Sequence, residues 1–414
     1  MRRPTIIFIN RVYPPMRGAT GRLLHDLVRS FARQGWHVSV VTTGVTSDDV
    51  YEKGVRVIRV KGPVKPSGAR AYVWIWLKLF FAALKQQKRH VVVTISDPPL
   101  LAVAGTLIAK FKRCYHINWC QDLYPEVLPS LGMNYSDFWM GLYTSLRRWA
   151  MNSSDKVIVN GRCMARYLTH EGGGDARKIA VVPNWPDLEL IDPEAVENND
   201  QEYCNIPEDA QPPRPYDKQL KTRSRFRILY AGNIGKVHPV DSIVDAAEIL
   251  EKEGSDVEFV FVGDGNGFDD LARTRSEKGL DNIRFIPFQP ISQLREIMET
   301  GDVHLISMKE EAAGFIVPSK LYSALAVARP CIFVGPEQCE CAKVIRDYGA
   351  GVVVSQGDAK MLVKAIKSFR ETGEAWFGAH NGALKAREVY TPHNLIDAWI
   401  ERAWDLVRND LEIK

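Results

Sequence analysis

Two carboxylates, a glycine, a proline and a Ser-Lys pair lie in the short stretch from Glu310 to Lys320. An apolar run typical of a strand, 303–306, precedes this stretch, and a run typical of a helix start, 321–326, follows it. Ligands of open α/β sheets bind at the carboxyl ends of the strands, and a helix N-terminus offers free N–H groups to an anion. The carboxylates are therefore candidate catalytic groups, and Lys320 is a candidate partner for a negative charge. The alternative is an ordinary strand-to-helix loop in which Ser319 caps the helix.

A second pair of carboxylates, Asp122 and Glu126, follows the strand predicted at 115–119. At the carboxyl end of that strand, a carboxylate would act as a base or bind a sugar hydroxyl. The alternative is that Asp122 caps a helix.

Glycine turns follow three of the predicted strands. Gly18 lies in the loop after 5–10, and the segments 232–235 and 263–267 follow the strands at 227–231 and 257–262. Glycine lets a ligand approach the backbone closely, and the turn at 232–235 fits a phosphate cradle. Gly18 is equally well explained as a turn glycine. The first strand and turn lack the G-x-G-x-x-G fingerprint of dinucleotide-binding proteins.

Strand and helix patterns alternate in two halves of the chain. The first half has strand patterns at 5–10, 37–42, 91–96, 115–119, 156–160 and 179–182, with amphipathic helices such as 21–34 between them. Residues 192–225 contain prolines and charges without periodicity, which indicates a linker or surface insertion. Strand patterns then resume at 227–231, 257–262, 283–286, 303–306, 331–334 and 351–354. This alternation predicts an α/β protein with two Rossmann-like parallel sheets.

The length and the cysteine content limit the class of protein. A chain of 414 residues is too long for one core and predicts two or three domains. Seven scattered cysteines fit a reducing compartment, and Cys339-x-Cys341 lacks a second pair at zinc spacing, so we expect no metal. Residues 1–10 do not read as a signal peptide, which predicts a cytoplasmic protein.

Charge is distributed unevenly along the chain. Residues 1–190 contain 27 Lys+Arg against 13 Asp+Glu, a net charge of +14, and the remainder carries −10. A basic half is expected to meet an anionic partner, such as nucleic acid, an anionic membrane surface or a phosphorylated acceptor. Since no nucleic-acid-binding motif is present, we expect no nucleic acid partner.

Residues 61–90 are the candidate for membrane contact. The mostly apolar stretch 71–84 has basic flanks, is interrupted by Lys78 and is too short to span a bilayer. Two tryptophans and two phenylalanines between basic flanks favour a helix lying in a membrane interface. The alternative is a helix that covers the sheet, with its basic ends in water.

Several short motifs, in their order along the chain, resemble one enzyme family over nearly the whole sequence. The motifs are Tyr13-Pro14-Pro15, Gly18-Ala19-Thr20, Val182-Pro183-Asn184-Trp185, Tyr230-Ala231-Gly232-Asn233-Ile234-Gly235, Val262-Gly263-Asp264-Gly265, Val317-Pro318-Ser319-Lys320-Leu321-Tyr322 and Ala328-Arg329-Pro330. They look like the retaining family 4 glycosyltransferases, which have the GT-B fold. The subgroup that they resemble builds bacterial O-antigen, capsule or exopolysaccharide and is similar to fucosaminyltransferases.

The resemblance implies an α/β, GT-B architecture in which two Rossmann-like parallel-sheet domains face each other across a cleft. It implies an acceptor-binding domain at 1–190, a linker or insertion at 191–225, a nucleotide-sugar-binding domain at 226–385, and a C-terminal helix at 386–414 that packs back on the first domain. The implied activity is transfer of a sugar, with retention, from a nucleoside diphosphate donor to a lipid-linked or polysaccharide acceptor. Such enzymes need no metal or other cofactor, and their loop at the position of Gly18 approaches the donor phosphates.

The chain departs from the broader family at the charged positions. The family has two glutamates spaced E-x7-E, which align here with Phe315 and Ser323, and Glu311 has the wrong spacing to replace the first. The family's Arg and Lys, after the first glycine turn of the second domain, align with Asn233 and His238. The phosphate charge must therefore be met elsewhere in this chain.

Lys320 and Lys236 are the candidates for that charge. A departing diphosphate needs positive charge and N–H donors more than a strong base, so Lys320 and the turn amides would stabilise it. The family's cleft histidine matches about Asp122, and Asp122 or Glu126 would orient or deprotonate the acceptor hydroxyl. The predicted catalytic residues are Asp122, Glu126, Lys320 and Glu311, and the predicted donor-binding residues are Gly18, Gly232, Asn233, Gly235, Lys236, Gly263, Gly265, Pro318, Ser319 and Lys320.

Two other functions fit the same residues. A nucleotide-sugar epimerase of the GT-B fold would release free nucleoside diphosphate without an acceptor. A non-catalytic sugar-nucleotide-binding protein is suggested by the missing glutamate pair. In each case the protein is expected in the cytoplasm, on the inner face of the cytoplasmic membrane if residues 61–90 bind lipid.

Overall fold

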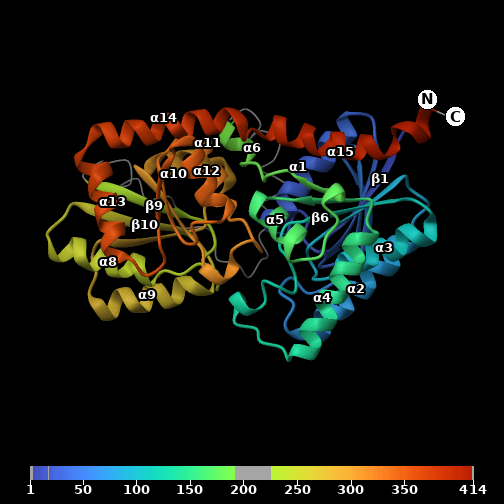
Figure 1. Ribbon diagram of the computed structural model, residues 1–414, viewed down its shortest axis with the longest axis horizontal. Helices are drawn as coiled ribbons and strands as arrows, with labels where there is room; N and C mark the ends of the chain where they lie inside the picture. The colour runs from blue at the N-terminus through green and yellow to red at the C-terminus, as the bar shows by residue number, and fades with distance from the viewer. Residues whose placement is uncertain (1–2, 17, 192–224, 413–414) are drawn as a thin grey trace.

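The computed structural model describes residues 3–16, 18–191 and 225–412, and it contains two parallel-sheet domains side by side (Figure 1). The predicted linker or insertion, 191–225, lies outside the described residues except at its two ends. The α/β class with two Rossmann-like sheets, predicted from the alternating pattern, is confirmed.

The first sheet has eight strands in the order β3-β4-β2-β1-β5-β6-β7-β8. All neighbours are parallel except β3 and β4. The strands are β1 (Thr5–Ile9), β2 (His37–Gly44), β3 (Asp48–Glu52), β4 (Val55–Lys61), β5 (Val91–Ile95), β6 (Tyr115–Cys120), β7 (Lys156–Val159) and β8 (Ile179–Val181). The hairpin β3–β4 was not predicted, because β3 is a polar edge strand. Its turn is formed by Lys53 and Gly54, both at positive φ, as two-residue hairpin turns require.

Helices cover both faces of the first sheet. On one face α1 (Ala19–Arg33) packs against the side chains of Ile6 and Phe8. On the other face Ile7 and Ile9 pack in a core with α2 (Gly68–Lys85) and α3 (Leu101–Lys112). The remaining elements of this domain are α4 (Asp137–Ser153), which packs on α3, the helices α5 (Arg162–His170) and α6 (Leu188–Ile191), and the short turns η1 (Pro129–Leu131) and η2 (Ala176–Lys178).

The second sheet has six parallel strands in the order β11-β10-β9-β12-β13-β14. The strands are β9 (Phe226–Ala231), β10 (Val257–Gly263), β11 (Ile283–Pro287), β12 (Val303–Ser307), β13 (Cys331–Val334) and β14 (Gly351–Val354). Between them lie α8 (Asp241–Lys252), α9 (Asn266–Lys278), η5 (Ile291–Gln293), α10 (Leu294–Thr300), η6 (Glu310–Ala312), α11 (Lys320–Ala326), α12 (Glu340–Tyr348) and α13 (Ala359–Glu371). The strand order reverses between β9 and β12, which is the topological switch point where such sheets bind ligands.

The last two helices extend along both domains (Figure 1). Helix α14 (Gly373–Val389) packs on α11 to α13 of the second domain, and α15 (Pro392–Glu412) continues over the first. The buried ring of Trp399 contacts Phe8, Phe31 and Trp119 of the first domain, with centroids 5.4–6.0 Å apart. The end of the chain therefore completes the core of the domain in which the chain began.

Candidate active site

Lys320 lies at the switch point of the second sheet. It is the first residue of α11, and its side chain crosses to the glycine turn after β9. A Cβ added to Gly232 would stand 3.1 Å from Lys320 Cε, and Gly232 has a φ of 119°, so this turn position suits only glycine. The ammonium Nζ lies 5.1 Å from the centre of the Tyr230 ring. The lysine and the glycine turn, predicted separately as phosphate ligands, therefore lie together.

His238 fixes the end of the Lys320 side chain. Its Nδ1 lies 2.7 Å from the carbonyl oxygen of Ser307, and because a carbonyl only accepts, Nδ1 carries the hydrogen. Its Nε2 then presents a lone pair to Lys320 Nζ at 3.4 Å. Burial lowers the pKa of His238 to about 3, so the ring is neutral and accepts a hydrogen bond from the lysine. The family's lysine position is thus occupied by His238, which positions the lysine at the start of α11.

The ammonium of Lys320 has no carboxylate partner among the described residues. Burial lowers the pKa of Lys320 to about 8. A buried ammonium that lacks an anion is stabilised when an anion binds beside it. Lys320 is therefore suited to a phosphate ligand at the switch point.

The two glycine turns of the second domain pack directly on each other. A Cβ on Gly263 would lie 2.5 Å from the carbonyl oxygen of Gly232, and one on Gly265 would lie 1.7 Å from Oδ1 of Asn233. The side chain of Asn233 is exposed, as is that of Lys236, and Gly235 is half-buried. The predicted donor-binding glycines therefore form one continuous backbone surface beside Lys320, while Lys236 lies on its solvent side.

The residues of the loop after β12 differ in their burial. Glu310 and Glu311 lie in η6 and are exposed, while Pro318 is buried and its carbonyl faces the thiol of Cys341. Ser319 is at the N-cap position of α11, as the alternative predicted, but it has helical backbone angles and its side chain makes no capping hydrogen bond.

Phe315 joins this loop to the first domain. Its carbonyl oxygen accepts a hydrogen bond of 2.8 Å from the amide of Leu123, and its ring packs edge-on against Tyr167 at 4.9 Å. Leu123 directly follows Asp122. Phe315, at the position of the family's first glutamate, thus holds the loop of Asp122 against the loop after β12.

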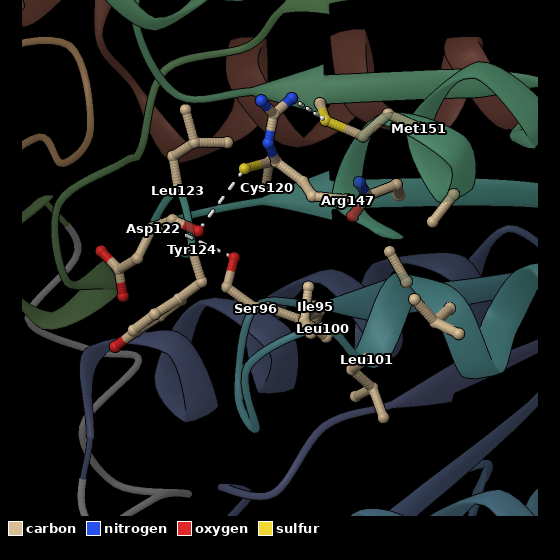
Figure 2. A pocket seen from close by; sticks show the side chains of 14 residues that line it. Ile95, Ser96, Leu100, Leu101, Cys120, Asp122, Leu123, Tyr124, Arg147 and Met151 are labelled. Carbon is tan, nitrogen blue, oxygen red and sulfur yellow. Dashed lines mark hydrogen bonds between the residues drawn. The ribbon is translucent and has the colours of Figure 1, made fainter. Parts of the chain in front are cut away.

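Asp122 lies where the chain leaves β6, beside a small cavity of about 30 Å³ (Figure 2). The hydroxyl of Ser96 accepts hydrogen bonds from the amides of Gln121 and Asp122 at 2.8 and 3.1 Å. The carboxylate of Asp122 points away from Arg147 in this view. Burial, with a smaller contribution from Asp97, raises the pKa of Asp122 to about 6. The next α-helix begins only at residue 137, so Asp122 does not cap a helix.

An ion pair missed by the sequence reasoning crosses the switch point of the first sheet. Arg11, after β1, pairs with Asp97, after β5, at 2.7 Å. Gly18 follows in the same loop as Arg11 and is exposed at the start of α1. Its backbone is extended, with a φ of 162°, but a Cβ there would lie 3.0 Å from Val12 Cγ1. Glycine is therefore favoured at position 18 by the close approach of Val12 rather than by an unusual backbone angle.

Glu126 is placed differently from Asp122. Its carboxylate pairs with Arg147 at 2.7 Å, and the two side chains are only 9% and 5% exposed. The role as acceptor base that was predicted for Glu126 is therefore difficult to combine with its geometry, which is that of a structural ion pair.

We expect the variant Glu126→Gln to lose stability rather than turnover. Removing one partner of a buried ion pair leaves an uncompensated charge and costs about 3 kcal/mol. Urea denaturation of the variant measures this loss, and Glu171→Gln, at an exposed glutamate, is the matched control. If the variant instead had the wild-type free energy of unfolding and a lower kcat, Glu126 would act in catalysis.

The pKa values of Asp122 and Lys320 predict a bell-shaped pH dependence. If the carboxylate of Asp122 acts as base, kcat/KM falls as the pH drops below about 6. If the ammonium of Lys320 holds the leaving group, kcat/KM falls as the pH rises above about 8. A bound phosphate favours the ammonium, so the alkaline limb of kcat lies at higher pH than that of kcat/KM. A flat profile of kcat/KM from pH 5 to 9 would contradict both roles.

Solved structures with the same arrangement define the fold. The chain is similar to sucrose-phosphate synthase from Thermosynechococcus elongatus, with a TM-score of 0.72, 15% identity, and 98% of this chain and 100% of that one covered. It is similar to HepE from Anabaena in complex with UDP-glucose, with a TM-score of 0.68, 14% identity, and 97% and 99% covered. The two-domain architecture is thus the GT-B fold, as the sequence motifs predicted.

Matches to known protein families indicate the type of reaction. Residues 18–185 match the glycosyl transferase 4-like domain, and residues 216–375 match glycosyl transferases group 1. The chain therefore belongs to the family 4 glycosyltransferases.

Two curated proteins are similar to this chain. The probable glycosyltransferase WbjE of Pseudomonas aeruginosa is 26% identical over 298 residues, 71% of this chain and 70% of that protein. The putative colanic acid biosynthesis glycosyl transferase WcaI of Escherichia coli is 27% identical over 280 residues, 65% and 64% of the two chains.

Within the described residues, no three His, Cys, Asp or Glu side chains gather closely enough to hold a metal ion.

Proposed function

We propose that the protein transfers a sugar from a nucleoside diphosphate donor to a lipid-linked or polysaccharide acceptor, with retention of configuration, in the synthesis of a bacterial surface polysaccharide. The name of WcaI includes the synthesis of colanic acid, and HepE has been solved with UDP and with UDP-glucose. These names support the donor class and the pathway class. The motifs after β9 and β12 support the fucosaminyltransferase-like subgroup.

The observation that carries the proposal is the position of Lys320 beside the two glycine turns. A sugar leaves a nucleoside diphosphate when the negative charge that develops on the diphosphate is stabilised. Lys320 supplies one positive charge there, held in place by His238. In the turn at 232–235 the amides of Gly232 and Ile234 already donate to Val262 and Asp264, which leaves the amides of Asn233 and Gly235 for the phosphate. This arrangement compensates for the missing Arg and Lys of the broader family, and it requires no metal.

Asp122 is the acceptor-side residue in this proposal. The hydrogen bond from Leu123 to Phe315 joins the loop of Asp122 to the loop that precedes Lys320, which supports a role for the carboxylate beside the transferred sugar. With a pKa of about 6, Asp122 is ionised at neutral pH and able to accept a proton from a hydroxyl. Glu311 is exposed on the same loop as Lys320 and is the remaining candidate to contact the donor sugar.

A screen of nucleotide sugars for thermal stabilisation, followed by transfer to lipid-linked and soluble saccharide acceptors, tests the proposal. Transfer that depends on both substrates, with an anomeric product configuration like that of the donor, is the expected result. Release of free nucleoside diphosphate without an acceptor would favour the epimerase. Tight donor binding with no turnover would favour the non-catalytic binding protein.

We further propose a cytoplasmic protein that contacts the membrane through residues 61–90. Helix α2 buries Ile75, Leu79 and Ala83 against the sheet, so the sheet-covering alternative holds for that side of the helix. Its other side exposes Trp74 and Phe81. No helix in the described part of the chain is long and apolar enough to cross a bilayer.

A further inference from the structure

Large apolar side chains are exposed on three neighbouring helices of the first domain. Helix α3 contacts both α2 and α4, and the three lie together on one side of the domain (Figure 1). Phe111 and Phe138 are 78% and 73% exposed. The main members of this surface are Trp74, Phe81, Phe111, Phe138, Trp139 and Leu142. Isolated exposed apolar residues need no explanation, but a gathered group marks a surface that binds something.

The first turns of α4 are the most apolar part of this surface. The rings of Phe138 and Trp139 contact each other at 5.4 Å, and Trp139 contacts Tyr143 at 6.2 Å. Asp137 is the only charged residue between 127 and 146. Because α4 leads into the parallel strand β7, its first turns lie toward the carboxyl ends of the strands, which is the end that carries Asp122.

The charge around these helices identifies the kind of partner. From Lys53 to Gln121 the chain has 13 Lys+Arg and one carboxylate, Asp97, which is paired with Arg11. Two of these cations, Arg56 and Arg59, pair with carboxylates of β3 just before this range, so the excess of positive charge comes from the others. The ammonium groups of Lys78 and Lys110 lie 5.4 and 4.9 Å from the ring centres of Trp74 and Trp149. Tryptophan rings favour the headgroup level of a bilayer, and Lys and Arg near the surface attract anionic headgroups.

We propose that α2, α3 and the first turns of α4 form one surface that binds the interface of a bilayer containing anionic phospholipid, with Phe138 and Trp139 inserted as its anchor. The contact therefore extends well beyond residues 61–90, and its most apolar part lies on an element that the basic segment does not include. The surface ends on the side of the domain where the acceptor carboxylate lies. This surface rests on the membrane contact proposed above for residues 61–90 and extends it. Lipid binding does not depend on sugar transfer, so vesicle binding tests the surface separately from the transfer reaction.

Flotation of the full chain with vesicles tests the anchor. We expect binding to vesicles of phosphatidylcholine with phosphatidylglycerol, and little to phosphatidylcholine alone. The double variant Phe138→Ser and Trp139→Ser should lose about tenfold in lipid affinity, since two aromatic side chains leave the interface. The matched control is Tyr51→Ser with Phe377→Ser, because both side chains are exposed, at 68% and 61%, on other elements, β3 and α14.

A second pair of variants tests the charge. Arg70→Glu with Lys85→Glu, at the exposed ends of α2, should remove most of the dependence on phosphatidylglycerol. Lys360→Glu with Lys364→Glu, at exposed positions of α13, should not. Wild-type protein that stays unbound, or α4 variants that bind as wild type, would overturn the proposal. A wild-type dimer that the α4 variants convert to monomer would assign the surface to a second copy of the chain and would also overturn it.

Discussion

Replacing Lys320 with alanine is expected to lower kcat by about 10²- to 10³-fold while the protein stays folded, because one preorganised charge is removed from the leaving group. Lys320 is half-buried, and its ammonium contacts His238 and Tyr230 and has no carboxylate partner among the described residues, so we expect the fold not to depend on its charge. Steady-state turnover of a nucleotide sugar with acceptor measures the loss. Circular dichroism measures retention of the fold.

A second variant separates charge from packing. Lys320→Met fills the space beside Gly232 without a charge, so we expect it to lose as much activity as Lys320→Ala. Lys364→Ala, at an exposed position of α13, is the control and should turn over normally. Wild-type turnover by Lys320→Met would show that the side chain acts by packing and would remove the charge from the mechanism.

Replacing Gly263 with alanine is expected to cost about 2–4 kcal/mol of stability and most of the affinity for donor nucleotide. The added Cβ would lie 2.5 Å from the backbone oxygen of Gly232, and the backbone has a φ of 146°, where side chains are strained. The two glycine turns would have to separate, and the turn that faces Lys320 would move. Urea denaturation and calorimetric titration with nucleoside diphosphates measure the two effects.

Gly254→Ala provides the matched control for this glycine. Gly254 also has a positive φ, 68°, but nothing lies within 4 Å of an added Cβ. We expect that variant to lose only about 1 kcal/mol, from backbone strain, with donor affinity unchanged. Equal behaviour of the two variants would mean that the contact between the glycine turns is unimportant for the donor.

Local sequence patterns were sufficient for all the strands of the second sheet and for six of the eight strands of the first, since β3 and β4 were missed. Buried β-branched and aromatic runs marked β1, β5, β9 and β10, and the glycine turns were found where the strands end. These features depend on residues close together in the chain, so their signals are contiguous in the sequence. The polar edge strand β3 was missed because its alternation is weak and neither of its faces is fully buried.

The sequence also predicted candidate catalytic residues, but not which residues they contact. Asp122 and Glu126 have the same residue chemistry and the same strand end, yet one lies beside a cavity and the other pairs with Arg147. Helix α2 was undecided between sheet and membrane, and the structure shows that one side of it packs on the sheet while the other remains exposed.

By itself, the sequence determined the α/β class, the two sheets and the glycine turns, and it predicted Lys320 as the partner of the phosphate charge. The tertiary structure alone decided that Lys320 meets His238, 82 residues away, that Phe315 joins the two domains, and that α15 returns to the first core. These contacts depend on the order of strands in the sheet and on the switch point between β9 and β12. Hydrophobic periodicity specifies which side of an element is buried but not which element lies beside it, so only the folded chain brings these residues together.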